Sequence, residues 1–163
     1  MPATYQPIES RTLGSAASSV TFTGIPQTYT DLVMVCRFIN TTGSPYGRFT
    51  INGDTGSTYS STWLEGTYSS ASSGRASNDN AAWLYYNGAA GTSGLTTTIT
   101  HFNNYSNTTT NKSIITRFGS TPQVGTYASL WRNTSAITSL TINAFVENFQ
   151  ANTTLTLYGI KAG

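Results

Sequence analysis

The sequence predicts an all-β protein, a single-domain, jelly-roll-like antiparallel β-sandwich, from three observations. Thr, Tyr, Val, Ile and Phe, which favour strands, are abundant, whereas the strong helix formers Lys, Glu, Gln and Met are scarce. No window places apolar residues at the i, i+3, i+4, i+7 spacing of an amphipathic helix. Short alternating segments recur instead at intervals of roughly 8–15 residues between Gly, Pro, Asn and Ser clusters, as in sandwiches and jelly rolls.

The first predicted strands lie between residues 19 and 86. Residues 19–23 alternate between polar and apolar side chains and end at a glycine. Residues 31–39 are apolar on both faces, which predicts a central strand of a sheet. Residues 48–52 form a short strand that also stops at a glycine. Residues 59–68 and 82–86 are aromatic-rich strands on either side of a loose polar segment.

The remaining predicted strands follow at short intervals without a helical crossover between them. Residues 95–102 form a Thr-rich strand, and residues 113–118 and 126–131 come next. Residues 139–146 place Leu, Ile, Ala and Val on one face, and residues 154–160 place two leucines on one face. Many short strands in succession predict two packed antiparallel sheets.

Polar stretches between these strands are predicted as loops. They cover residues 41–46, 69–80 and 103–111. The middle stretch is rich in Ser, Gly and Ala, and its low complexity predicts a mobile connection. Residues 1–10 are expected to form an extended N-terminal arm because two prolines disfavour a central strand, which leaves residues 11–163 for the sandwich.

Composition excludes several functional classes. Charged residues make up 9% of the chain and the formal net charge is +2, without a cluster of Lys and Arg, so no nucleic-acid-binding surface is predicted. No run of about 18 apolar residues occurs, and the first residues lack the basic start and apolar stretch of a signal peptide, so no membrane contact is expected. Cys36 is the single cysteine, which excludes an internal disulfide and a cysteine-based zinc site.

Few residues are suited to catalysis or metal binding. The six acidic residues are scattered, no Gly-x-Ser-x-Gly motif occurs, and His101, the single histidine, is expected to be half-buried and hydrogen-bonded on a strand. Residues 52–57 carry oxygen ligands but lack the Glu that closes an EF-hand loop, so their Asn-Gly pair favours a plain turn. Cys36 is expected to be a buried, unreactive thiol. We therefore expect no enzyme, no cofactor and no metal site.

Aromatic residues flank the polar segment on both sides and admit two interpretations. If exposed, they would stack on sugar rings or anchor a protein interface, and if buried, they would fill the core. The residues are Tyr59, Trp63, Tyr68, Trp83, Tyr85 and Tyr86.

The stretches 8–32, 48–60 (RFTINGDTGSTYS) and 154–160 (TLTLYGI) together bracket almost the whole chain. They resemble segments common in virion proteins of tailed phages, especially cyanophages. The resemblance implies a jelly-roll-like, non-enzymatic structural protein of the virion, made in the host cytoplasm. Such proteins serve as capsid decoration (cement) subunits or as components of the tail and its fibres.

The first functional hypothesis is a capsid decoration protein that binds the outer face of the major capsid protein lattice and stabilises the head. Proteins of this kind often form homotrimers, so a trimer is expected here as well. The expected N-terminal arm would lie on a neighbouring subunit or on the capsid shell, which makes Tyr5, Pro7 and Ile8 candidate contact residues.

The alternative hypothesis is a tail or fibre component that recognises a glycan on the host surface. Trp63, Trp83, Tyr85 and Tyr86 would then form the stacking platform, with Asn and Asp side chains from the loops as hydrogen-bonding groups. A polysaccharide depolymerase is a third and weaker hypothesis, because it requires a pair of carboxylates that the sequence does not indicate.

Overall fold

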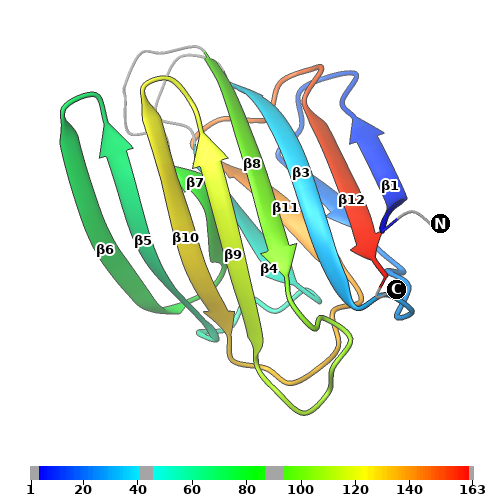
Figure 1. Ribbon diagram of the computed structural model, residues 1–163. Helices are drawn as coiled ribbons and strands as arrows, with labels where there is room; N and C mark the ends of the chain where they lie inside the picture. The colour runs from blue at the N-terminus through cyan, green and yellow to red at the C-terminus, as the bar shows by residue number, and fades with distance from the viewer. Residues whose placement is uncertain (1–3, 41–45, 87–93, 162–163) are drawn as a thin grey trace.

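The computed structural model describes residues 4–40, 46–86 and 94–161, and its regular structure there is entirely β (Figure 1). This part of the chain contains no helix long and apolar enough to cross a membrane. The strands are β1 (Tyr5–Thr12), β2 (Ser19–Phe22), β3 (Asp31–Asn40), β4 (Tyr46–Ile51), β5 (Tyr59–Thr67), β6 (Ser70–Asp79), β7 (Ala82–Tyr86), β8 (Gly94–Phe102), β9 (Lys112–Gly119), β10 (Gln123–Trp131), β11 (Leu140–Phe145) and β12 (Thr154–Ile160).

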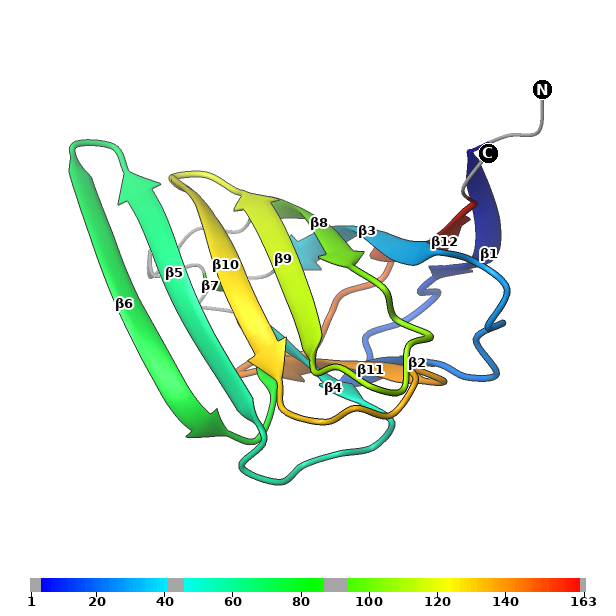
Figure 2. The same ribbon diagram turned by 60° about the horizontal axis from the view of Figure 1, so that its bottom comes forward.

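The strands form two antiparallel sheets, which confirms the predicted β-sandwich. The large sheet has eight strands in the order β1-β12-β3-β8-β9-β10-β5-β6, and the small sheet has four in the order β2-β11-β4-β7. Figure 2 shows that the small sheet covers only part of the large one, because β5 and β6 extend beyond it. The strand of the small sheet that lies against β10 and β5 is β7.

The core lies where the two sheets face each other. On β3, the alternate residues Leu32, Met34 and Phe38 are fully buried, and Phe49 of the small sheet meets Phe102 of the large sheet edge-to-face at 5.5 Å between ring centroids. Burying an apolar side chain of this size stabilises the fold by about 1.5–3 kcal/mol. Strand β3 lies between β12 and β8, as its two apolar faces predict.

Most strand predictions are confirmed. The segments predicted at residues 82–86 and 154–160 coincide with β7 and β12, and the other predicted strands differ from the observed ones by three residues or fewer at either end. Most of them place apolar side chains in the core, as β12 does with Leu155 and Leu157. Strand β8 instead buries Thr96, Thr98 and Thr100. Residues 103–111 form a loop, as expected, while residues 41–45 lie outside the described part of the chain.

The prediction of a mobile loop at residues 69–80 is wrong, because Ser70–Asp79 form β6 and pair with β5 along its whole length. The strand carries no apolar alternation, since it is the outermost strand of the large sheet and the small sheet does not cover it. Its backbone hydrogen bonds to β5 hold it in place, and they leave no signature in side-chain hydropathy.

Residues 5–12, most of which belong to the expected N-terminal arm, form strand β1 and pair with β12. The strand is the edge of the large sheet opposite β6. An edge position tolerates Pro7, which has no N–H to donate, and the register shifts between Pro7 and Glu9.

The turn after β4 has the positive φ that its Asn-Gly pair predicts, 53° at Asn52 and 71° at Gly53. It does not close a hairpin, however, because it carries the chain from the small sheet to β5 of the large sheet. The Asp54 carboxylate there accepts hydrogen bonds from Trp131 Nε1 at 2.7 Å, Gly56 N at 2.9 Å and Thr58 Oγ1 at 2.8 Å. Both carboxylate oxygens therefore accept hydrogen bonds that hold this turn in place.

Two further predictions about single residues are confirmed. Cys36 is fully buried, and burial raises the pKa of its thiol to about 12. His101 is half-buried on the outer face of the large sheet, with Nε2 at 3.3 Å from Arg117 Nη2.

Candidate functional site

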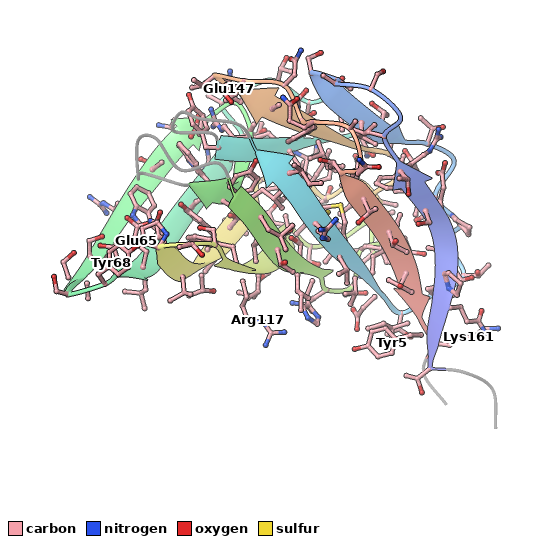
Figure 3. The ribbon with its side chains drawn as sticks, turned by 90° about the horizontal axis from the view of Figure 1, so that it is seen from above. Tyr5, Glu65, Tyr68, Arg117, Glu147 and Lys161 are labelled. Carbon is pink, nitrogen blue, oxygen red and sulfur yellow. The ribbon has the colours of Figure 1, made fainter. Side chains whose placement is uncertain are left out.

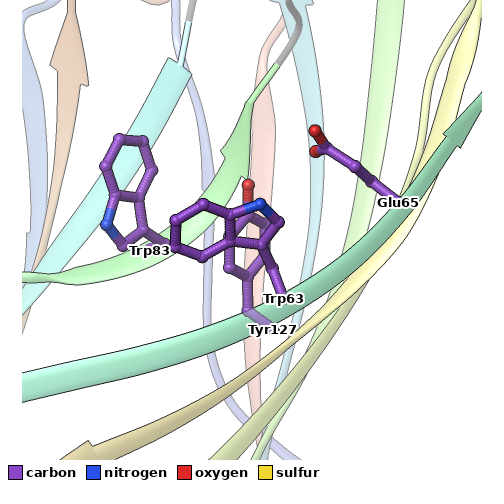
Figure 4. A pocket seen from close by; sticks show the side chains of 4 residues that line it. All are labelled: Trp63, Glu65, Trp83 and Tyr127. Carbon is purple, nitrogen blue, oxygen red and sulfur yellow. The ribbon is translucent and has the colours of Figure 1, made fainter. Parts of the chain in front are cut away.

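The structure brings three aromatic side chains and one carboxylate together where β5 and β6 extend past the small sheet. They line a pocket of about 180 Å³ formed by Trp63 and Glu65 of β5, Tyr127 of β10 and Trp83 of β7 (Figure 4). We call it the aromatic pocket. It lies on the inner face of the large sheet, beside the edge of the small sheet.

The period of a β-strand and the register of the ladders place these residues. Trp63 and Glu65 are two residues apart, so both point to the same face of β5. In the β10–β5 ladder, Tyr127 is directly opposite Trp63. Trp83 comes from the other sheet, on its edge strand β7. Two adjacent strands of the large sheet and the edge of the small sheet therefore build the pocket together.

The three rings pack against one another. Trp83 and Tyr127 are almost parallel, with 6.2 Å between ring centroids and an interplanar angle of 11°. Trp63 lies 6.4 Å from Trp83 and 6.0 Å from Tyr127, inclined by 43° and 42°. Tyr127 is buried, whereas both tryptophans are half-buried and form the accessible apolar wall.

A glycine on β6 sets the position of Trp63. Gly74 is directly opposite Trp63 in the β5–β6 ladder. A Cβ atom at Gly74 would come within 2.3 Å of Trp63 Cζ2, closer than any real contact allows. The indole therefore lies against the bare backbone of β6, which explains why this edge strand needs a residue without a side chain at that point.

Glu65 is held by two neutral donors. Its Oε2 accepts a hydrogen bond from Gln123 Nε2 at 2.6 Å, and its Oε1 accepts one from Ser72 Oγ at 3.0 Å. Gln123 is buried at the start of β10, so it fixes one side of the carboxylate firmly. In Figure 4 the carboxylate extends from β5 toward the aromatic side chains.

Polar and charged groups also hold Trp83 from outside the pocket. Its Nε1 donates to Asp79 Oδ2 at 3.2 Å, and the Arg48 guanidinium carbon lies 4.9 Å from the centre of its ring. Arg48 is itself buried and forms an ion pair with Asp79. A cation over an indole face is attracted by the ring, so this arrangement keeps Trp83 in one orientation.

The structure unites only part of the predicted stacking platform. Trp63 and Trp83 lie in the aromatic pocket. The prediction for Tyr85 is wrong, because its side chain is 1% exposed and packs between the sheets against Phe38, with 5.0 Å between ring centroids. Burial also raises the pKa of the Tyr85 hydroxyl. The backbone of Tyr86 belongs to β7, but its side chain lies outside the described residues.

The other candidate contact residues lie on β1, at the far edge of the large sheet. Tyr5 is 52% exposed and packs edge-to-face on Tyr158, with 6.4 Å between ring centroids. Pro7 is exposed, whereas Ile8 packs against the core. Figure 3 shows Tyr5 and Glu65 at opposite ends of the molecule, so these residues take no part in the aromatic pocket.

Two residues of the pocket were missed in the sequence analysis. Tyr127 and the buried Trp131 are four residues apart on β10, so they lie on the same face of the strand and Tyr127 points inward. Its position opposite Trp63 depends on the pairing of β10 with β5. Glu65 is one of the six acidic residues that are scattered along the sequence. Its spacing of two residues from Trp63 was the available signal that the two side chains share a face.

Glu65 is the single carboxylate that lines the aromatic pocket in the described part of the chain. Glycoside hydrolysis ordinarily uses two carboxylates across one bond. No group of three or more His, Cys, Asp and Glu side chains suited to a metal ion occurs among the described residues. The lining offers aromatic surface from Trp63, Trp83 and Tyr127 and the acceptor oxygens of Glu65.

No protein-family model and no curated protein matches the chain. Among solved structures, a toad ovary galectin in complex with thio-digalactose is similar, with 12% identity over 87% of this chain and 99% of that chain and a TM-score of 0.36. The CBM2 module of the evolved Dit of Lactobacillus casei BL23 phage J-1 gives 11% identity, 94% and 76% coverage and a TM-score of 0.32. The Caenorhabditis elegans galectin LEC-6 is similar with 6% identity over 94% of this chain and 96% of that chain and a TM-score of 0.35. These distant similarities concern the β-sandwich fold alone.

Proposed function

We propose that this protein is a non-enzymatic carbohydrate-binding β-sandwich that holds a sugar ring in the aromatic pocket. The observation that carries the proposal is the joining of two half-buried tryptophans and a fixed carboxylate in one hollow of the inner face. Binding sites for small molecules are concave and mostly apolar, with a few placed polar groups that orient the ligand. The aromatic pocket has this composition.

A sugar suits these two kinds of surface. A pyranose ring has an apolar face of C–H groups and a rim of hydroxyl groups. Trp63 and Trp83 offer aromatic surface for the face, and Glu65 offers acceptor oxygens for the rim. The pocket volume of about 180 Å³ is below the roughly 300–1,000 Å³ of sites for drug-sized ligands, which favours one ring of a glycan over a longer segment.

The pocket is held in place before any ligand arrives. The backbone at Gly74 supports Trp63, Asp79 and Arg48 hold Trp83, and Gln123 holds the carboxylate opposite. Ordering a flexible side chain on binding costs about 0.5–1.5 kcal/mol. Side chains that are already ordered avoid this cost, so even a small contact area yields measurable affinity.

The test is binding of the purified protein to a glycan array, followed by calorimetric titration of the best glycan. Trp63→Ala and Trp83→Ala should each weaken binding about thirtyfold, because truncating a tryptophan anchor costs about 2 kcal/mol or more. Tyr68→Ala is the matched control, since Tyr68 is 88% exposed and does not line the pocket. Absence of any bound glycan, or equal losses in the control, would contradict the proposal.

The sequence resemblance to phage virion proteins suggests where such a module would act, as a part of the tail or fibre that recognises host glycan. Its expected role in capsid decoration, as a trimer on the major capsid protein, is a second candidate. That role is favoured by apolar side chains exposed on the outer face of the large sheet, Leu64, Ile115, Val124 and Leu130. The number of copies per purified particle separates the two, because decoration requires a simple ratio to the major capsid protein and a tail part requires only a few copies.

A further inference from the structure

The charge of the aromatic pocket points to the class of sugar that it takes, an inference that rests on the proposed function. We infer that the pocket binds neutral and amino sugars and rejects sugars that carry a carboxylate. The observation behind it is an uncompensated negative charge at the rim of the pocket, presented by Glu65.

Within the described residues, Glu65 is the only charged residue that lines the pocket. Its two hydrogen-bond donors, the Gln123 amide and the Ser72 hydroxyl, carry no charge. The residues outside the described ranges (1–3, 41–45, 87–93 and 162–163) contain no Asp, Glu, Lys, Arg or His. No side chain from those segments can therefore neutralise Glu65.

Two arginines on strands next to the pocket-forming strands, Arg48 on β4 and Arg75 on β6, do not offset this charge. Arg48 lies against the Trp83 ring and is paired with Asp79, so its charge is already balanced. Arg75 is the neighbour of Gly74 on β6. Because Gly74 faces the pocket and successive side chains on a strand alternate, Arg75 points to the opposite face of the sheet.

The remaining acceptor capacity of Glu65 decides what it selects. An ionised carboxylate has about four acceptor positions, and two are used by Gln123 and Ser72. The free positions suit hydroxyl groups, and an ammonium group satisfies them with opposite charge as well. A uronic acid brings a second carboxylate that has no proton to donate and repels Glu65, an effect that partial removal of water strengthens.

The experiment compares matched ligands on the full chain by calorimetric titration. Each ring found to bind is presented as its neutral methyl glycoside, its 2-amino-2-deoxy form and its uronate. The wild type should bind the neutral and amino forms at least about tenfold more tightly than the uronate. Glu65→Gln should reduce this discrimination to less than about threefold, while Glu147→Gln, which removes a carboxylate outside the pocket, should retain it.

The outcomes separate this inference from the proposed function. Uronates that bind the wild type as tightly as the neutral forms would overturn the inference and leave sugar binding intact. Full discrimination retained in Glu65→Gln would also overturn it, because another group would then be responsible. Absence of any bound glycan on the array that selects these rings would overturn the proposed function and the inference with it. Thermal unfolding of each variant verifies that it is folded.

Discussion

The covered and uncovered parts of the large sheet differ in what their inner faces carry. Under the small sheet, β3 and β8 present fully buried side chains such as Met34 and Phe102. Beyond it, β5 and β6 present Trp63, Glu65 and Gly74 on the same side of the same sheet. Backbone pairing is continuous across both parts. A sandwich whose sheets differ in width leaves part of one inner face uncovered, and here aromatic side chains and a carboxylate meet on that part.

The largest effect of a single substitution is expected in the covered part of the large sheet. Phe102→Ala should lower the free energy of unfolding by about 3–5 kcal/mol, since it removes a fully buried ring that packs edge-to-face on Phe49. Urea denaturation measures the loss. Leu64→Ala, at a side chain that is 61% exposed on the other face of the sheet, is the control and should change stability by less than about 0.5 kcal/mol.

A smaller and different effect is expected in the uncovered part. Gly74→Ala should weaken sugar binding about tenfold, because the new methyl group occupies the space of the Trp63 indole and displaces it. Gly66→Ala is the control within the same hairpin, since its Cβ would meet only Ser70 O at 3.7 Å. Calorimetric titration measures both. If Gly74→Ala bound sugar as tightly as the wild type, Gly74 would have no role in positioning Trp63.

The smallest effect concerns pH and the turn between the sheets. Desolvation opposes the shift, but hydrogen bonds from Trp131, Gly56 and Thr58 lower the pKa of Asp54 below its ordinary value of 3.8. Ionised Asp54 therefore stabilises the fold above pH 3.8. This contribution is lost as the pH falls through the lowered pKa of the folded protein. Asp54→Asn should lower the free energy of unfolding by about 1 kcal/mol at pH 7, and it should lessen the fall of stability as the pH drops below 3.8. Sugar binding should not change, and an unaltered fall of stability in acid would contradict this account.

The sequence predicted the strands whose side chains enter the core. It did not predict features that depend on backbone hydrogen bonds or on which strands pair. Strands β3 and β12 could be predicted because their inner residues, Leu32 and Leu157 among them, are apolar and meet the other sheet. Strand β6 was not readable, since its hydrogen bonds to β5 leave no pattern in the side chains. Only two of the four residues that line the aromatic pocket, Trp63 and Trp83, were predicted from the sequence. The two tryptophans were visible as an aromatic cluster, whereas the pairing of Tyr127 with Trp63 is set by a non-local register.

The most direct test of the central claim follows the three tryptophan indole N–H signals by NMR while a neutral sugar is added. Two of the three tryptophans, Trp63 and Trp83, line the aromatic pocket, and Trp131 is buried with its Nε1 bonded to Asp54 at 2.7 Å. Single Trp→Phe variants assign the signals. We expect the Trp63 and Trp83 signals to shift in a saturable way while the Trp131 signal stays in place. Saturable binding that leaves the signals of Trp63 and Trp83 unmoved would contradict the claim that the aromatic pocket is the sugar site.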